Sequence, residues 1–103
     1  MIGCPIGAKN TLDKNYLHLA ENLGATIIPE TEVTGVRPLD GGYEVMTRQT
    51  TGVLHPKRSH RVSGAVFSGG VMGTVPLLMR CRQQGWLPRL SDSLGRLVRT
   101  NSE

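Results

Sequence analysis

The sequence predicts an α/β domain made of a helix, an antiparallel β-meander and a final strand–helix unit. Three observations support this prediction. Apolar residues repeat at helical spacing early in the chain, glycine-centred turns separate β-type segments in its middle, and the apolar segment 62–67 runs straight into a glycine turn and a second helical pattern. A strand that feeds a helix in this way is typical of a βα unit in a parallel sheet.

The first expected element is a helix that follows a loop over residues 1–10. Asn10 or Thr11 is the expected N-cap, and Gly24 stands where a left-handed C-terminal cap is needed. One face of this helix is apolar, formed by Leu12, Tyr16, Leu19, Ala20 and Leu23. We expect that face to pack in the core of the protein.

Several short β-type segments follow the helix. A first strand is expected at 25–28 and ends at Pro29. The sequence then predicts a hairpin of strands 32–37 and 43–49 around the turn Asp40-Gly41-Gly42, and a third meander strand at 60–63 after a loop over 50–57.

The C-terminal part predicts the strand–helix unit. Residues 62–67 are expected to form a buried strand, and 71–84 a helix that ends at Gly85. Pro76 falls inside this helix, where it favours a slight kink. Beyond the helix we expect a loop with one short helical turn at 91–94.

Composition restricts the function classes. A chain of 103 residues holds one domain at most, and 38% hydrophobic with 19% charged residues is an ordinary globular composition. The net charge of +4 comes from scattered Lys and Arg residues, and four aromatic residues are too few for a base-stacking surface, so nucleic-acid binding is not expected. The sequence shows neither a signal peptide nor an apolar run of membrane length, which predicts a cytoplasmic protein with Cys4 and Cys81 as free thiols.

The candidate binding site lies in the stretch SGGVMG, residues 68–73. Gly69, Gly70 and Gly73 allow a ligand to approach the backbone, and the helix that follows offers free amides. The alternative is that these glycines only permit tight strand-to-helix packing. The stretch is not a full G-x-G-x-x-G fingerprint, and no acidic residue follows about 20 positions later to bind a ribose. No catalytic or metal-binding constellation is expected in this chain.

Four blocks taken together resemble a known family. They are GAKNTLDKNYLHLAENLGA, TEVTGVRPLDGGYEV, SGGVMGTVPLLMRCRQQGWLPRLSDSLG and VRTNSE. In order and spacing they are similar to the middle of the glucose–methanol–choline (GMC) flavoprotein oxidoreductases, and most similar to the cholesterol oxidase-like branch. The resemblance covers nearly the whole chain. Val75 separates Thr74 from Pro76, which departs from the branch that carries Ser/Thr-Pro directly after the glycines.

The resemblance implies a fragment, residues 1–103, of a Rossmann-like FAD-binding domain in an enzyme that oxidises alcohols or sterols. It implies that the Val33 backbone contacts the FAD adenine and that Gly69, Gly70, Gly73 and Thr74 lie near the cofactor. The glycine-rich βαβ unit and the catalytic part of the family are expected outside this chain, which would then be inactive alone. Cys4 matches the end of a cysteine-rich stretch in some bacterial members.

A second interpretation remains open at this stage. The alternative to the fragment is a free-standing small α/β protein that binds or interacts without catalysis.

Overall fold

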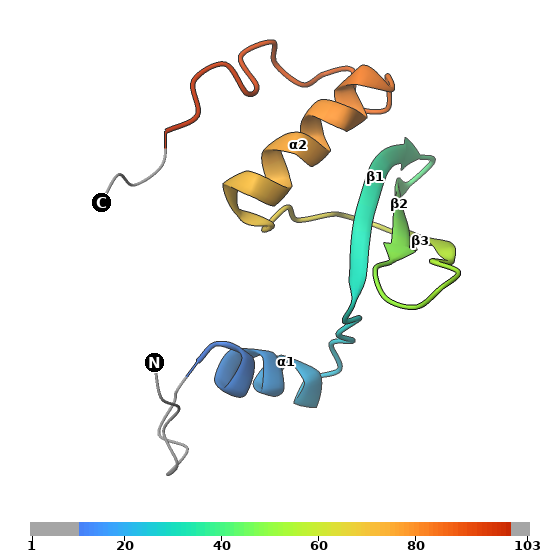
Figure 1. The fold of residues 1–103 in the computed structure, drawn as a ribbon, viewed down its shortest axis with the longest axis vertical. Coiled ribbons are helices and arrows are strands. Elements are labelled where there is room, and N and C mark those ends of the chain that lie inside the picture. The colour runs from blue at the N-terminus through green and yellow to red at the C-terminus, as the bar shows by residue number, and fades with distance from the viewer. Residues whose placement is uncertain (1–10, 100–103) are drawn as a thin grey trace.

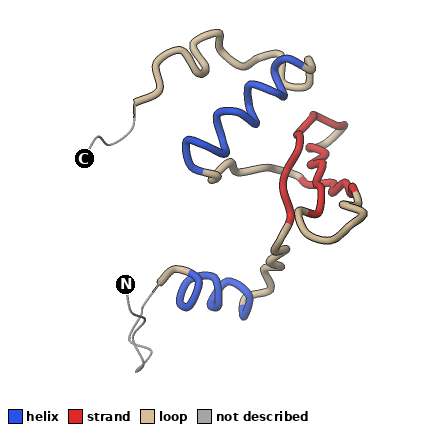
Figure 2. Tube along the Cα trace, viewed as in Figure 1, coloured by secondary structure: helices blue, strands red, loops and turns tan. Residues whose placement is uncertain are grey.

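The computed structural model describes residues 11–99, and it builds them around a three-stranded antiparallel sheet (Figures 1 and 2). The strands are β1 (Thr31–Leu39), β2 (Gly42–Gln49) and β3 (Lys57–Val62), in the order β1-β2-β3. The hairpin and the third strand of the meander are therefore confirmed. β1 and β2 are longer than expected, and β3 begins three residues before the predicted start because Lys57 pairs with Arg48.

One helical segment precedes the sheet in the sequence and another follows it. The first is a π-helical turn, η1 (Asp13–Leu17), that continues into α1 (His18–Asn22), and the second is α2 (Gly70–Gln83). Gly24 and Gly85 have φ values of +98° and +71°, so both glycines end their helices as the sequence predicts. The first helix begins after Leu12 at its N-cap, and Asn10 lies outside the described residues. No helix within residues 11–99 is both long and apolar enough to cross a membrane.

The core lies where α2 packs against β1. Val36 on β1 is 2% exposed and Cys81 on α2 is fully buried as a free thiol, while Thr47 on β2 is 7% exposed. Pro76 lies inside α2 without ending it, because its helix continues to Gln83. A short turn follows at the predicted place, with the Leu94 N–H donating to the Ser91 carbonyl at 3.1 Å.

Three sequence-based expectations are wrong. Residues 25–28 form no strand and are exposed, and residues 63–68 connect β3 to α2 without pairing (Figure 2). The reason is the same in both places: among residues 11–99 no further strand lies beside them to supply ladder hydrogen bonds. The described sheet is accordingly all antiparallel, and it contains no parallel βα unit.

The third wrong expectation concerns the apolar face of the first helix. Leu12, Tyr16, Leu19 and Leu23 are between 55% and 89% exposed, and α1 packs against no element except η1. Figure 1 shows α1 well separated from the sheet. The helical pattern is real, but no described part of the chain covers it.

Candidate functional site

A cavity of about 520 Å³ lies between the sheet, the connection 63–68 and the first turns of α2. Valines of all three strands form its floor, namely Val33, Val36, Val45 and Val62. These valines share one face of the sheet because directly paired residues point to the same side and so do alternate residues of a strand. Val62, Val36 and Val33 pair with Tyr43, Val45 and Thr47, which alternate along β2. Ala65, Phe67 and Leu77 add apolar walls from the connection and α2.

Val33 lies on β1, which is an edge strand of the sheet. The Thr50 N–H donates to the Glu30 carbonyl at 2.8 Å, and the Gln49 N–H points the other way, to Pro56 on the β3 side, at 3.1 Å. Antiparallel pairs alternate between hydrogen-bonded and non-hydrogen-bonded. Counting from Glu30, the pair of Val33 with Thr47 is non-hydrogen-bonded, so the Val33 N–H and C=O point away from β2 toward the free edge.

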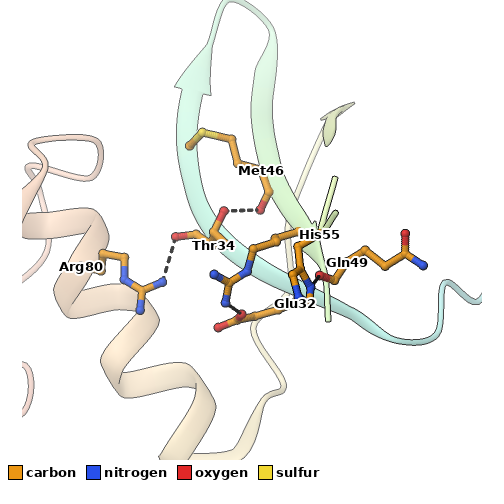
Figure 3. Close-up of polar contacts among 7 residues, drawn as sticks. Glu32, Thr34, Met46, Gln49, His55 and Arg80 are labelled. Atoms are coloured by element: carbon orange, nitrogen blue, oxygen red, sulfur yellow. Dashed lines mark hydrogen bonds and ion pairs between the residues drawn. The ribbon is translucent and has the colours of Figure 1, made fainter. Parts of the chain in front are cut away.

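A β-bulge follows Val33 directly. The register shifts between Val33 and Gly35, so Thr34 is the extra residue on β1. The Thr34 hydroxyl donates to the Met46 carbonyl at 3.3 Å, and the Thr34 carbonyl accepts a hydrogen bond from Arg80 Nη1 at 3.3 Å (Figure 3). The bulge therefore turns one carbonyl of β1 outward to α2.

The glycine turn at the start of α2 borders the same cavity. Gly69, Gly73 and Thr74 line it, but Gly70 does not. Gly70 has φ +64°, which explains the need for glycine there by backbone conformation alone. The Gly69 N–H donates to the Thr74 hydroxyl at 3.0 Å, so this amide is already used within the turn.

The structure thus brings four of the five predicted site residues to one cavity: Val33, Gly69, Gly73 and Thr74. Sequence reasoning missed Arg80, which also lines the cavity. Gly35 was a usable signal for the bulge whose Thr34 carbonyl Arg80 contacts, because an isolated glycine inside a strand pattern indicates a bulge or a close approach of another segment.

The cavity carries few charged groups. Glu32 lines it and forms an ion pair with Arg48 at 2.6 Å, and Arg80 lines it from α2 (Figure 3). The described residues contain no cluster of three or more His, Cys, Asp or Glu side chains that could hold a metal ion. The one resolved pKa effect among the described residues is on Glu44, a half-buried carboxylate of the central strand β2 outside the cavity, where the hydrogen bond from Arg37 lowers the pKa. The arrangement suits binding of a flat, mostly apolar group and offers no acid–base pair.

Comparison with known proteins gives a consistent relationship over the full chain. The chain is 46% identical to a cholesterol oxidase of Acinetobacter baumannii and 50% identical to cholesterol oxidases of two strains of Mycobacterium tuberculosis. These matches cover 100% of the chain but only 20% and 18% of the relatives, so the chain spans about a fifth of their length. No family model matches the chain, and no solved structure matches it significantly. The chain is therefore similar, along its entire length, to one segment of cholesterol oxidases.

Proposed function

We propose that this chain is a segment of an FAD-dependent oxidoreductase that acts on the CH–OH group of a sterol or another alcohol. Within it, the chain supplies part of the FAD adenine site and of the sheet scaffold, and the reactive groups lie elsewhere in the protein. The observation that carries the proposal is the outward-facing backbone of Val33 beside a cavity that the glycine turn also lines. The similarity to cholesterol oxidases over 100% of the chain supports it.

The adenine edge matches the Val33 backbone chemically. A strand-edge residue offers one N–H donor and one C=O acceptor. Adenine presents a ring-nitrogen acceptor beside an exocyclic-amine donor, so both backbone groups can be satisfied at once. The cavity of about 520 Å³ has the size of a ligand site, and its valine floor suits a purine face.

The glycine turn is less suited to the pyrophosphate of FAD. The Gly69 amide is occupied by Thr74, and no lysine lines the cavity. A dinucleotide pyrophosphate normally sits at a glycine-rich turn and a helix N-terminus. We therefore expect another segment of the whole protein to hold the pyrophosphate, and the isolated chain to bind FAD only weakly.

Catalysis also requires groups that the described residues do not place at the cavity. Bound FAD would supply a hydride acceptor for the alcohol carbon, and the reaction would also need a base for the hydroxyl proton. The titratable side chains at the cavity are Glu32 and Arg80, and both are engaged in hydrogen bonds. The isolated chain is expected to show no FAD-dependent oxidation of cholesterol or simple alcohols.

A free-standing interaction protein is the second candidate, and the uncovered apolar face of the first helix favours it. The same exposure is expected of a segment that packs inside a larger protein. FAD binding separates the two, because only the first proposal gives Val33 a role in holding a nucleotide.

A segment exchange tests the proposed function. In the Acinetobacter baumannii cholesterol oxidase, the matching segment is replaced by this chain, and the FAD content and affinity of the purified protein are measured. We expect FAD to be retained. Val33→Pro removes the amide donor and is expected to weaken FAD binding by roughly 0.5–1.5 kcal/mol plus strain. Val33→Ala keeps the amide and should leave the affinity nearly unchanged.

Three results would count against the proposal. An exchanged protein that folds but holds no FAD would show that this chain does not supply a competent part of the site. Equal losses from Val33→Pro and Val33→Ala would mean that the side chain, rather than the backbone, matters at this position. Submicromolar FAD affinity of the isolated chain would contradict the division of the site between segments.

A further inference from the structure

The free edge of β1 is held by α2 at two backbone groups that follow Val33. Arg80 Nη1 donates to the Thr34 carbonyl at 3.3 Å, and the Val36 N–H donates to Cys81 Sγ at 3.4 Å. Arg80 and Cys81 are consecutive residues of α2, so one helical turn forms hydrogen bonds with two outward-facing backbone groups of the edge strand. Figure 3 shows Arg80 reaching from α2 to Thr34.

We propose that Arg80 and Cys81 are positioning residues that fix the direction in which the Val33 N–H and C=O point. The proposal rests on the proposed function, because Val33 matters only if it contacts the adenine. Neither Arg80 nor Cys81 needs to touch the nucleotide for this role, although Arg80 borders the same cavity.

The physical basis is the alternation of backbone groups along a strand. Consecutive residues of an edge strand point their N–H and C=O groups alternately toward the partner strand and toward the free edge. A shift of one residue in register would turn the Val33 groups toward β2 and away from the cavity. The bulge at Thr34 determines which residues of β1 point their backbone groups toward the free edge. The two contacts with α2 form only with the alternation that the structure shows.

Burial makes the Cys81 contact sensitive to substitution. Cys81 is fully buried and Val36 is 2% exposed, so water cannot replace the thiol as acceptor. An amide without a partner in such a place is unfavourable. The Arg80 contact lies nearer the surface, where the guanidinium keeps further N–H groups in solvent.

Hydrogen exchange of the full chain tests whether the two contacts hold the edge. In Cys81→Ala, exchange of the Val36 amide is expected to accelerate on the order of tenfold, because the acceptor is gone. Cys81→Ser keeps an acceptor and should restore most of the protection. Arg82→Met is the control for Arg80→Met, since Arg82 donates to the Ser91 carbonyl at 2.9 Å and does not reach β1.

Nucleotide discrimination tests whether the edge positions Val33. In the exchanged cholesterol oxidase, affinities are measured for FAD and for its analogue with hypoxanthine in place of adenine. Hypoxanthine reverses the donor and acceptor that face the Val33 backbone, so discrimination depends on the direction of that backbone. Arg80→Met and Cys81→Ala are expected to reduce the preference for FAD about 2- to 12-fold, the value of one neutral hydrogen bond.

Each outcome decides one of the two ideas. A lower preference in Arg80→Met with an unchanged preference in Arg82→Met supports positioning. Equal weakening of both nucleotides, or no change, overturns the positioning role while leaving the proposed function in place. If the exchanged protein without these substitutions holds no FAD, the proposed function fails, and unaltered exchange of the Val36 amide in Cys81→Ala would still overturn the claim that α2 holds the edge.

Discussion

The two helical regions end with the same backbone motif but differ completely in what surrounds them. In the first, the N–H groups of Gly24 and Ala25 donate to the carbonyls of Glu21 and Ala20. In the second, the N–H groups of Gly85 and Trp86 donate to the carbonyls of Arg82 and Cys81. Both are Schellman endings with glycine at the left-handed position. Only the second is followed by a large side chain that returns to the fold.

The two regions differ in the residue that follows the helix-ending glycine, which is Trp86 in the second region. Its ring lies against Gly35 on β1, so close that a Cβ on that glycine would be 2.3 Å from Trp86 Cζ3. The corresponding residue after the first helix is Ala25, which is exposed. A turn motif therefore determines where the chain is directed, and the side chain after the turn determines whether it packs.

Apolar periodicity identifies a helix or strand face that favours burial, but it does not supply the partner that buries it. Leu23, on the helix face that was expected in the core, is 89% exposed, whereas Val36 on β1 is 2% exposed. The first helix packs against no other element of the described chain, whereas β1, α2 and Trp86 pack together. Trp86 can report on the unfolding of that packed region because it is the single tryptophan.

The largest effect is expected for Gly35→Val. The added side chain would collide with the Trp86 ring and with Met46 Cε, which lies 3.0 Å from an ideal Cβ. We expect a loss of about 3 kcal/mol in the free energy of unfolding, the upper part of the overpacking range. Urea denaturation followed by Trp86 fluorescence measures it. Gly64→Val is the matched control, since its Cβ meets nothing within 4 Å; a similar loss there would show that the contact with Trp86 is not the cause.

The next effect compares truncation of one apolar residue in each region. Val36→Ala is expected to cost about 2 kcal/mol, because it removes two buried methyl groups beside Cys81. Leu23→Ala removes exposed atoms and should stay within about 0.5 kcal/mol. Urea denaturation curves of both variants measure the two losses in the free energy of unfolding. Losses of equal size would mean that the first helix is packed in solution, contrary to its exposure in the structure.

A smaller effect is expected from the two helix-ending glycines. Gly85→Ala forces alanine into φ +71° next to Trp86 and is expected to cost about 1 kcal/mol. Gly24→Ala is equally strained locally, at φ +98°, but should not shift the unfolding midpoint seen by Trp86. Circular dichroism should instead report a loss of helix in Gly24→Ala. A common shift of the midpoint in both variants would join the two regions into one cooperative unit.

The smallest effect concerns pH. The hydrogen bond from Arg37 holds the pKa of Glu44 below its ordinary value near 4.5, so the carboxylate is favoured in the folded state. A lowered folded-state pKa stabilises the fold above the unfolded pKa, and this stabilisation is lost as the pH falls through the folded value. Glu44→Gln should therefore reduce the acid sensitivity of the sheet unit slightly. If the urea midpoint of Glu44→Gln depends on pH below about 4.5 as it does without the substitution, this ion pair does not contribute to acid sensitivity.

Local signals in the sequence located most of the secondary structure. The turn Asp40-Gly41-Gly42 and the alternation on both sides of it determined the hairpin, and Gly24 and Gly85 determined two helix ends, because their φ values exclude most other residues. Glycine chemistry indicated Gly69, Gly70 and Gly73 as site residues, and the family resemblance added Val33 and Thr74. All of them except Gly70 line one cavity. Their role toward a cofactor stays a prediction.

Tertiary structure alone decided what each element packs against and which backbone groups face the cavity. The segments 25–28 and 63–68 have strand-like sequences, but a strand exists only where a neighbour completes its hydrogen bonds. The bulge at Thr34 depends on how β1 pairs with β2. The contacts of Arg80 and Cys81 with β1, and the approach of Trp86 to Gly35, join residues about 45 to 50 positions apart in the chain. Gly35 signals that another segment approaches β1, but no local pattern identifies that segment, because spacing within a segment describes one face of one element, whereas contact depends on the position of two.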